Sequence, residues 1–488
     1  MNANLNLSDP ALLRQQAYVN GEWLAQTESF AVHNPATGEL LAQVAQTSLA
    51  QLDVALVAAE QAQRSWAQLT AKQRAQIMRR WFDLIVAYAD DLALILTAEQ
   101  GKPLPEARGE VLYGASFIEW FAEEAKRING DLPATTWADK RPMVLKQPIG
   151  VCAAITPWNF PNAMITRKVA PAIAAGCSIV LKPAEQTPLS ALALAVLAER
   201  AGLPAGVLNV VTADSQRSIE IGQALCASKV VRHLSFTGST PVGRILMRQS
   251  ADTVKKLALE LGGHAPFIVF EDADLDAAVE GALQSKYRNA GQTCVCTNRF
   301  YVHESIYDEF LNRFAARIKA LKVGNGMQAG VEQGPLIEEA AIEKVQAHIA
   351  DALSKGGRLL AGGQRLHKDT LFFEPSLIAD VRPEMLVMQE ETFGPLAAVC
   401  SFQSEAEVVA AANATDFGLA AYFYARDIQR VWRVAEQLDY GIVGVNTGVV
   451  SNEVNPFGGV KQSGLGREGS RYGIDEYLEM KYVCLGGM

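Results

Sequence analysis

The chain has 488 residues, of which 49% are hydrophobic and 20% charged, and its formal net charge is −9. This composition excludes a disordered chain, and the length suggests about two to four domains. The acidic balance, with Lys and Arg scattered singly, argues against nucleic acid or a membrane surface as a partner. An anionic small substrate would therefore need local cations to hold it.

The cysteines constrain the compartment. Seven of them are spread along the chain with no CxxC pair and no neighbouring histidine cluster. This pattern is neither a disulfide framework nor a zinc site, so no metal is expected. The N-terminal segment lacks the regions of a signal peptide, and the longest apolar stretch, 169–181, is too short to span a bilayer. We expect a reducing, cytoplasmic compartment.

The first part of the chain predicts helices. Apolar residues recur at helical spacing over 49–56 and again over 77–85, after the candidate N-cap Thr70. A third helix is expected to end at Gly101, because glycine favours the left-handed conformation of a helix C-terminus and Pro103 follows.

From Val144 onward short apolar runs alternate with helical segments. Strands are expected at 150–155, 177–181, 207–211 and 233–236. This alternation predicts a doubly wound parallel α/β sheet, a common home for nucleotide cofactors. No GxGxxG follows a strand, but FTGSTPVG follows the fourth, where Gly238 permits a tight turn before a helix N-terminus that could receive a phosphate.

A second α/β unit is expected from about Gly262. It would begin with a strand at 267–270 and a helix at 275–283, and continue in alternation to about Gly444. The segment 477–485 alternates in strand fashion and is expected to pair with another element or subunit.

Three segments contain candidate catalytic side chains. YRNAGQTCVCTNR carries Cys294 and Cys296 on a turn introduced by Gly291, where a thiol is either an exposed nucleophile or a small core residue. Asn159 follows a strand between two prolines and either supplies oxyanion donors or satisfies a turn. Glu260 lies among apolar neighbours, where burial raises the pKa of a carboxyl toward neutrality and suits a general base.

Seven motifs occur in the order found in the aldehyde dehydrogenase superfamily and extend over nearly the whole chain: ITPWNFP, LKPAEQTP, FTGSTPVG, LELGG, GQTC, EETFGP and PFGGVKQSGLGRE. The chain resembles that family, and especially its succinate-semialdehyde and glutarate-semialdehyde dehydrogenases, through AMITRK, KYRNAGQTCVC and VVSNEVNPFGG. The resemblance implies two doubly wound α/β domains and a small β oligomerisation element. It assigns an NAD(P)-binding domain to 1–130 and 151–261, a catalytic domain to 262–463, and the oligomerisation element to 131–150 and 464–488.

The resemblance also implies a mechanism. Cys294 would attack the aldehyde to give a thiohemiacetal and then a thioester, Asn159 would hold the oxyanion, and Glu260 would activate the hydrolytic water. The implied reaction is NAD(P)-dependent oxidation of succinate semialdehyde, with glutarate semialdehyde as the alternative. A catalytically silent structural protein is less favoured, because Cys294 and Asn159 are both present. Another aldehyde dehydrogenase activity is also less favoured: a CoA-acylating enzyme would typically lack Glu260, and a betaine-aldehyde enzyme would need aromatic residues where this chain has arginines.

The family pattern assigns ligand contacts as well. Those to the cofactor are Trp158, Lys182, Glu185, Gly238, Ser239, Glu391 and Phe393. The Glu185 carboxylate would repel a 2′-phosphate, so NAD is expected as the preferred cofactor, with NADP as the second choice.

Other assignments concern the substrate and the assembly. Arg167, Arg288 and Ser451 would bind the distal carboxylate of a small anionic aldehyde, although a single arginine in a surface ion pair is the alternative. Cys296 is either a redox partner of Cys294 or a packing residue. A homodimer or homotetramer is implied.

Overall fold

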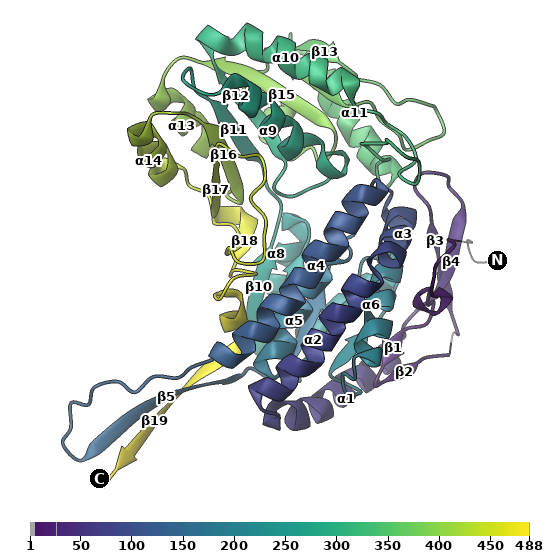
Figure 1. Cartoon of the computed structure of the whole chain (residues 1–488), viewed down its shortest axis with the longest axis vertical. Coiled ribbons are helices and arrows are strands. Elements are labelled where there is room, and N and C mark those ends of the chain that lie inside the picture. The colour runs from purple at the N-terminus through teal and green to yellow at the C-terminus, as the bar shows by residue number, and fades with distance from the viewer. Residues whose placement is uncertain (1–4, 26, 488) are drawn as a thin grey trace.

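The computed structural model describes residues 5–25 and 27–487 and consists of two lobes and a projecting arm (Figure 1). Each lobe is built on one large sheet, with eight strands in the lower lobe and seven in the upper. The α/β class predicted from the alternation of apolar runs and helices is confirmed. No helix within the described ranges is long and apolar enough to cross a membrane.

The lower sheet has the strand order β18-β10-β9-β6-β7-β8-β1-β2. Its parallel centre is β6 (Val151–Ile155), β7 (Ser178–Lys182), β8 (Leu208–Val210), β9 (Val231–Thr237) and β10 (Lys256–Glu260). Its antiparallel edges are β1 (Tyr18–Val19), β2 (Glu22–Trp23) and β18 (Gly464–Leu465). The chain runs from β6 outward to β8 and returns to β9 on the other side of β6. This reversal opens a crevice at the carboxyl ends of β6 and β9, where doubly wound sheets bind ligands.

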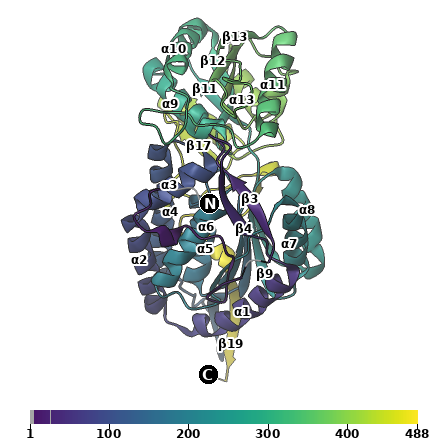
Figure 2. The same ribbon diagram turned by 90° about the vertical axis from the view of Figure 1, so that its right-hand side faces the viewer.

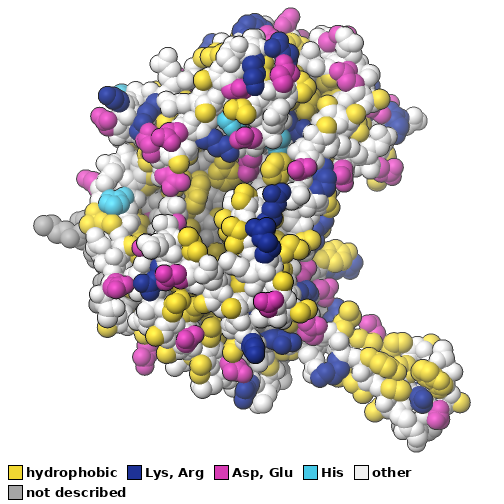
Figure 3. Space-filling model, turned by 180° about the vertical axis from the view of Figure 1, so that it is seen from behind, with side chains coloured by type: hydrophobic (Ala, Val, Ile, Leu, Met, Phe, Trp, Pro, Cys, Tyr) yellow, Lys and Arg dark blue, Asp and Glu magenta, His cyan; other side chains and the backbone are white. Residues whose placement is uncertain are grey.

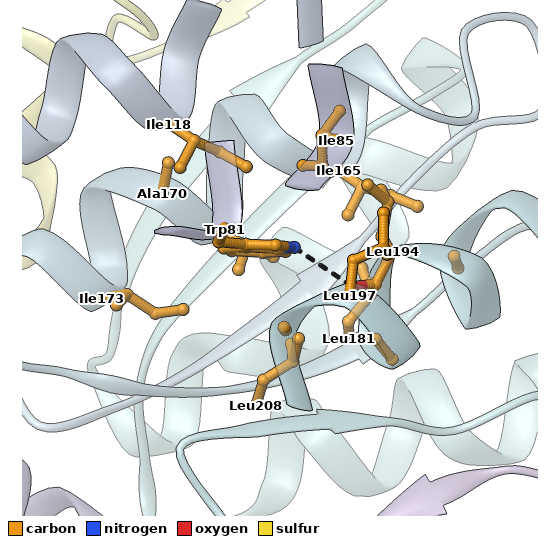
Figure 4. Packing of buried hydrophobic residues seen from close by; sticks show 14 of the residues in the cluster. Trp81, Ile85, Ile118, Ile165, Ala170, Ile173, Leu181, Leu194, Leu197 and Leu208 are labelled. Carbon is orange, nitrogen blue, oxygen red and sulfur yellow. Dashed lines mark hydrogen bonds between the residues drawn. The ribbon is translucent and has the colours of Figure 1, made fainter. Parts of the chain in front are cut away.

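Eight helices accompany this sheet: α1 (Leu49–Gln68), α2 (Ala71–Ala87), α3 (Ala89–Gln100), α4 (Leu104–Glu124), α5 (Ala163–Ala175), α6 (Pro188–Arg200), α7 (Ser215–Ala227) and α8 (Thr240–Ser250). Thr70 caps α2 in a reciprocal pair of hydrogen bonds with Gln73, as predicted. Gly101 ends α3 with φ 96°, also as predicted. The core beneath the helices includes Trp81, whose indole N–H donates to the carbonyl of Leu194 at 3.2 Å (Figure 4).

The helix α4 was not predicted. Pro103 was interpreted only as the end of the preceding helix, but it is also the N-cap of α4, and Pro105 lies in the first turn. Proline is tolerated there because the first turn has no intrahelical partner for its N–H groups. This helix packs on α5 and forms one wall of the cavity described below.

The upper sheet has the strand order β13-β14-β15-β12-β11-β16-β17. Its strands are β11 (Ala265–Val269), β12 (Thr297–His303), β13 (Arg358–Ala361), β14 (Ser376–Ala379), β15 (Leu396–Phe402), β16 (Ala420–Tyr424) and β17 (Ile442–Val445), all parallel except β13. Its helices are α9 (Leu275–Tyr287), α10 (Tyr307–Ala320), α11 (Glu339–Ser354), α12 (Leu386–Gln389), α13 (Glu405–Asn413) and α14 (Ile428–Gln437).

Two pairs of strands lie outside the large sheets. The first is β3 (Ser29–His33) with β4 (Leu40–Ala45). The second is the arm, in which β5 (Lys140–Pro148) pairs antiparallel with β19 (Leu478–Gly486) and projects beyond the lower lobe (Figures 1 and 2). The predicted C-terminal strand therefore pairs within its own chain. Because β18 pairs with β10 in the lower sheet, only β19 projects from the described part of the segment 464–488.

Candidate active site

A cavity of about 590 Å³ is lined by residues of both lobes. From the lower sheet, Asn159 follows β6 and Glu260 ends β10, so both lie at carboxyl ends of parallel strands. From the upper sheet, Cys294 precedes β12 and Glu391 precedes β15, so both lie near amino ends. The carboxyl edge of one sheet thus faces the amino edge of the other across the cavity.

The loop that carries Cys294 has an unusual backbone. Three successive residues adopt left-handed conformations, with φ 51° at Asn289, 55° at Ala290 and 74° at Gly291. A Cβ atom at Gly291 would lie 2.2 Å from the carbonyl oxygen of Gly394, so only glycine fits. Left-handed non-glycine residues cost free energy and concentrate at functional sites. The strained turn redirects the chain from α9 to the cysteine.

Glu260 acts on the thiol of Cys294 through its charge. Cys294 is half-buried, and burial together with the Glu260 charge raises the pKa of its thiol well above its usual value. Glu260 is 2% exposed, and burial, followed by the neighbouring charge of Glu468, raises its pKa to about 7. Neither Glu260 oxygen has a hydrogen-bond partner in the part of the chain that the structure describes. A buried carboxyl beside a thiol is suited to proton transfer.

Hydrogen bonds hold both the side-chain amide and the backbone carbonyl of Asn159. Its side-chain Nδ2 donates to the carbonyl of Gln292 at 3.0 Å, which leaves one N–H for a ligand. Its backbone carbonyl accepts from Lys102 Nζ at 2.8 Å and from Asn289 Nδ2 at 3.0 Å. The cysteine loop and the start of α4 therefore fix the asparagine together.

Lys102 also forms a buried ion pair that the sequence did not reveal. Its Nζ lies 2.5 Å from Glu110, and both side chains are 1% exposed. Glu110 in turn accepts from the backbone N–H groups of Asn162 at 2.9 Å and Ala163 at 3.3 Å, which caps α5. The sequence signal was weak, because a lysine just after a helix C-cap ordinarily lies in solvent. This pair links α4, α5 and Asn159.

The residues assigned to a dinucleotide lie along the carboxyl edge of the lower sheet and across from it. Trp158, Gly238, Ser239, Glu391 and Phe393 line the cavity. Lys182, at the end of β7, forms an ion pair with Glu185 at 3.3 Å. The hydroxyls of Thr156 and Thr237, beside β6 and β9, are buried with no partner among residues 5–25 and 27–487. Unpaired donors at this crevice fit a polar cofactor.

Glu391 and Phe393 are both constrained. Glu391 accepts from the backbone N–H of Gly263 at 3.0 Å, and burial raises its pKa to about 7. Phe393 is left-handed, with φ 54°, and its ring packs edge-on against Trp158 at 5.6 Å. These contacts pre-organise the wall where the family pattern places the nicotinamide.

The three residues assigned to the substrate carboxylate all line the same cavity. Arg167 is buried, its Nε lies 3.4 Å from Glu468, and its guanidinium lies 4.0 Å from the ring of Phe457. Its Nε and Nη1 have no hydrogen-bond partner among the described residues. Arg288 is half-buried and forms no ion pair within them. Together with Ser451, these groups offer unused donors to an anion.

Cys296 differs from Cys294 in access. It is 2% exposed, its thiol donates to the carbonyl of Lys286 at 3.6 Å, and burial raises its pKa. A packing role accounts for these contacts. Redox pairing with Cys294 stays a prediction.

Comparisons with known proteins all point to one protein family. Residues 23–483 match the aldehyde dehydrogenase family. The chain is 61% identical to a 3-sulfolactaldehyde dehydrogenase of Pseudomonas putida, with 99% of each chain covered. It is 59% identical to a glutarate-semialdehyde dehydrogenase of Pseudomonas aeruginosa, over 99% of this chain and 100% of that protein.

Two further similarities concern succinate semialdehyde. The chain is 58% identical to the NADP(+) succinate-semialdehyde dehydrogenase of Escherichia coli, over 99% of this chain and 100% of that protein. The solved structure of a succinate-semialdehyde dehydrogenase from Burkholderia pseudomallei superposes with a TM-score of 0.97 at 63% identity, covering 98% of this chain and 99% of that one.

The raised pKa of Glu260 predicts a pH profile. Below about pH 7 its carboxyl is protonated and cannot accept a proton, so kcat should fall as pH is lowered through this value. The substitution Glu468→Gln removes a nearby negative charge and should move the acidic limb to lower pH. Steady-state kcat between about pH 5.5 and 9 measures both effects, and an acidic limb that stays in place in Glu468→Gln would contradict the assignment.

Proposed function

Because the chain belongs to the aldehyde dehydrogenase family, we propose that it oxidises succinate semialdehyde to succinate with NAD(P)+ and water. The observation that supports this choice of substrate is that two arginines line the same cavity as Cys294. Arg167 has no hydrogen-bond partner for its Nε and Nη1 among the described residues, and Arg288 forms no ion pair within them. An arginine fork matches a carboxylate, so one end of a short substrate would be anchored while its aldehyde meets the thiol.

The first half of the reaction joins Cys294 to the aldehyde. Because the pKa of the thiol is raised, the group starts as a thiol and transfers its proton to ionised Glu260 as the C–S bond forms. The carbonyl oxygen becomes an oxyanion, which accepts from the remaining N–H of Asn159 and from the backbone N–H of Cys294. The product is a thiohemiacetal.

A nicotinamide cofactor, when bound, supplies the acceptor for the hydride. Lys182 and Glu185 would hold its adenosine ribose, Trp158 and Ser239 its phosphates, and Glu391 with Phe393 its nicotinamide end. Glu260 releases the proton of the thiol to solvent, and its carboxylate then takes a proton from a water molecule that attacks the thioester on Cys294. Cleavage of the C–S bond releases the acid, and the proton on Glu260 passes to the leaving thiolate to regenerate the thiol.

Two other anionic aldehydes remain as alternatives. Glutarate semialdehyde is longer by one methylene, which changes binding by only ~1–3 kcal/mol in a typical pocket. 3-Sulfolactaldehyde is the second, because the relative with 61% identity is named for it. Its sulfonate would bind the same two arginines.

For the cofactor we propose a preference for NAD. Glu185 lies beside Lys182, where its charge would oppose a 2′-phosphate. The E. coli relative is named for NADP(+), so the NAD preference proposed for this chain differs from the cofactor in that name.

For the assembly we propose a homodimer or homotetramer formed through the arm, in a reducing, cytoplasmic compartment. Apolar side chains gather on the arm (Figure 3), among them Leu145, Met480 and Tyr482, which are 39–75% exposed. Exposed apolar patches commonly mark interfaces. The seven cysteines are free, as a reducing compartment would require.

The anchor role of the arginines predicts a loss that depends on substrate charge. Arg167→Ala and Arg288→Ala should each raise KM for succinate semialdehyde at least about tenfold, because a charged hydrogen bond contributes about 1.5–3 kcal/mol. KM for butanal, which has no carboxylate, should change little. Steady-state kinetics on both aldehydes measures the difference, and equal losses would reject the anchor role.

The role of Glu185 predicts a change of cofactor selectivity. Glu185→Ser removes the charge that opposes a 2′-phosphate, so kcat/KM for NADP should rise relative to that for NAD. Initial rates with both cofactors at fixed aldehyde concentration measure the ratio. Glu199→Ser, an exposed glutamate on α6, is the matched control and should leave the ratio unchanged. An unchanged ratio in Glu185→Ser would remove this basis for the NAD preference.

A further inference from the structure

Tyr113 lines the catalytic cavity but has no role in the reaction described so far. It lies on α4, and its ring packs edge-on against Phe117 at 4.9 Å. Its hydroxyl oxygen is buried and has no hydrogen-bond partner within the described part of the chain. A buried hydroxyl without a partner costs about 1–3 kcal/mol, so a ligand atom in the cavity is a natural partner.

The positive charges around the hydroxyl favour a negatively charged partner. Arg167 lies 5.5 Å from the ring of Phe117, which is the ring that Tyr113 contacts one helical turn away. Burial raises the pKa of Tyr113, while the positive charges of Arg167 and Arg288 act to lower it. The hydroxyl therefore stays protonated at neutral pH and is a donor beside two cations.

We propose that Tyr113 is a specificity-determining residue whose hydroxyl donates a hydrogen bond to the terminal oxyanion of a short anionic aldehyde held by Arg167 and Arg288. The inference rests on the proposed function, since it requires an anion at these arginines. Carboxylate and sulfonate groups both present oxygens that accept hydrogen bonds, and a sulfonate has one such oxygen more than a carboxylate. A methyl group at the same end of the substrate would leave the hydroxyl unpaired, so Tyr113 favours anions over uncharged aldehydes.

The test is Tyr113→Phe in the full-length enzyme with its cofactor. Three aldehydes of similar length are compared: succinate semialdehyde, 3-sulfopropanal and butanal. We expect kcat/KM to fall at least about tenfold for an anionic aldehyde, through KM, because a hydrogen bond to a charged group is lost. For butanal kcat/KM should be unchanged. The melting temperature should not fall, because the hydroxyl that is removed has no hydrogen-bond partner among residues 5–25 and 27–487.

The matched control is Tyr422→Phe. The Tyr422 hydroxyl donates to the carbonyl of Val295 at 2.9 Å, so its loss should lower the melting temperature and affect charged and uncharged aldehydes alike. A loss in Tyr113→Phe for only one of the two anions supports the proposal and identifies the head group. Equal losses on all three aldehydes, or no change on any, would overturn it.

The substrate preference of the wild-type protein distinguishes a failure of this proposal from a failure of the proposed function. If it does not prefer the anionic aldehydes over butanal, the proposed function itself fails. If it does prefer them and Tyr113→Phe keeps the same preference, only the role of Tyr113 is overturned.

Discussion

The removal of Glu260 from water is the constraint on which the chemistry of this site depends. Burial and the neighbouring charge of Glu468 raise its pKa to about 7, so the carboxylate form exists at neutral pH and the acid form is close in free energy. A solvated glutamate would be too weak a base to receive a proton from Cys294 or water. The same burial raises the pKa of the thiol, so nucleophile and base depend on each other.

The two sheets hold the catalytic residues in a rigid frame. Asn159 comes from the carboxyl edge of one sheet and Cys294 from the amino edge of the other, so their relative position depends on how the lobes pack. The buried ion pair of Lys102 and Glu110 ties Asn159 to α4 and α5. Breaking a buried pair by removing one partner typically costs about 3–5 kcal/mol, so this frame resists distortion. Pre-organised donors need no rearrangement when charge develops on the substrate.

The sequence predicted the elements whose signals are local. The apolar runs of the lower sheet and the helix end at Gly101 are examples, because periodicity and glycine conformation are properties of short segments. The start of α4 was missed because Pro103 can end one helix and begin the next. Lys102 and Tyr113 were missed for a different reason: their burial results from the packing of α4 against distant parts of the chain. The left-handed Ala290 is likewise imposed by tertiary contacts, not by residue type.

The central claim is that Cys294 carries the substrate as a thioester and that Glu260 is needed to release it. Intact-protein and peptide mass spectrometry of Glu260→Gln, mixed with succinate semialdehyde and NAD+, tests this claim most directly. At alkaline pH, where the thiol can ionise without a base, the account predicts that one succinyl group accumulates on the peptide that contains Cys294, after a single burst of reduced cofactor, and that none accumulates in the wild type. Full turnover by Glu260→Gln with no acylated peptide would contradict it.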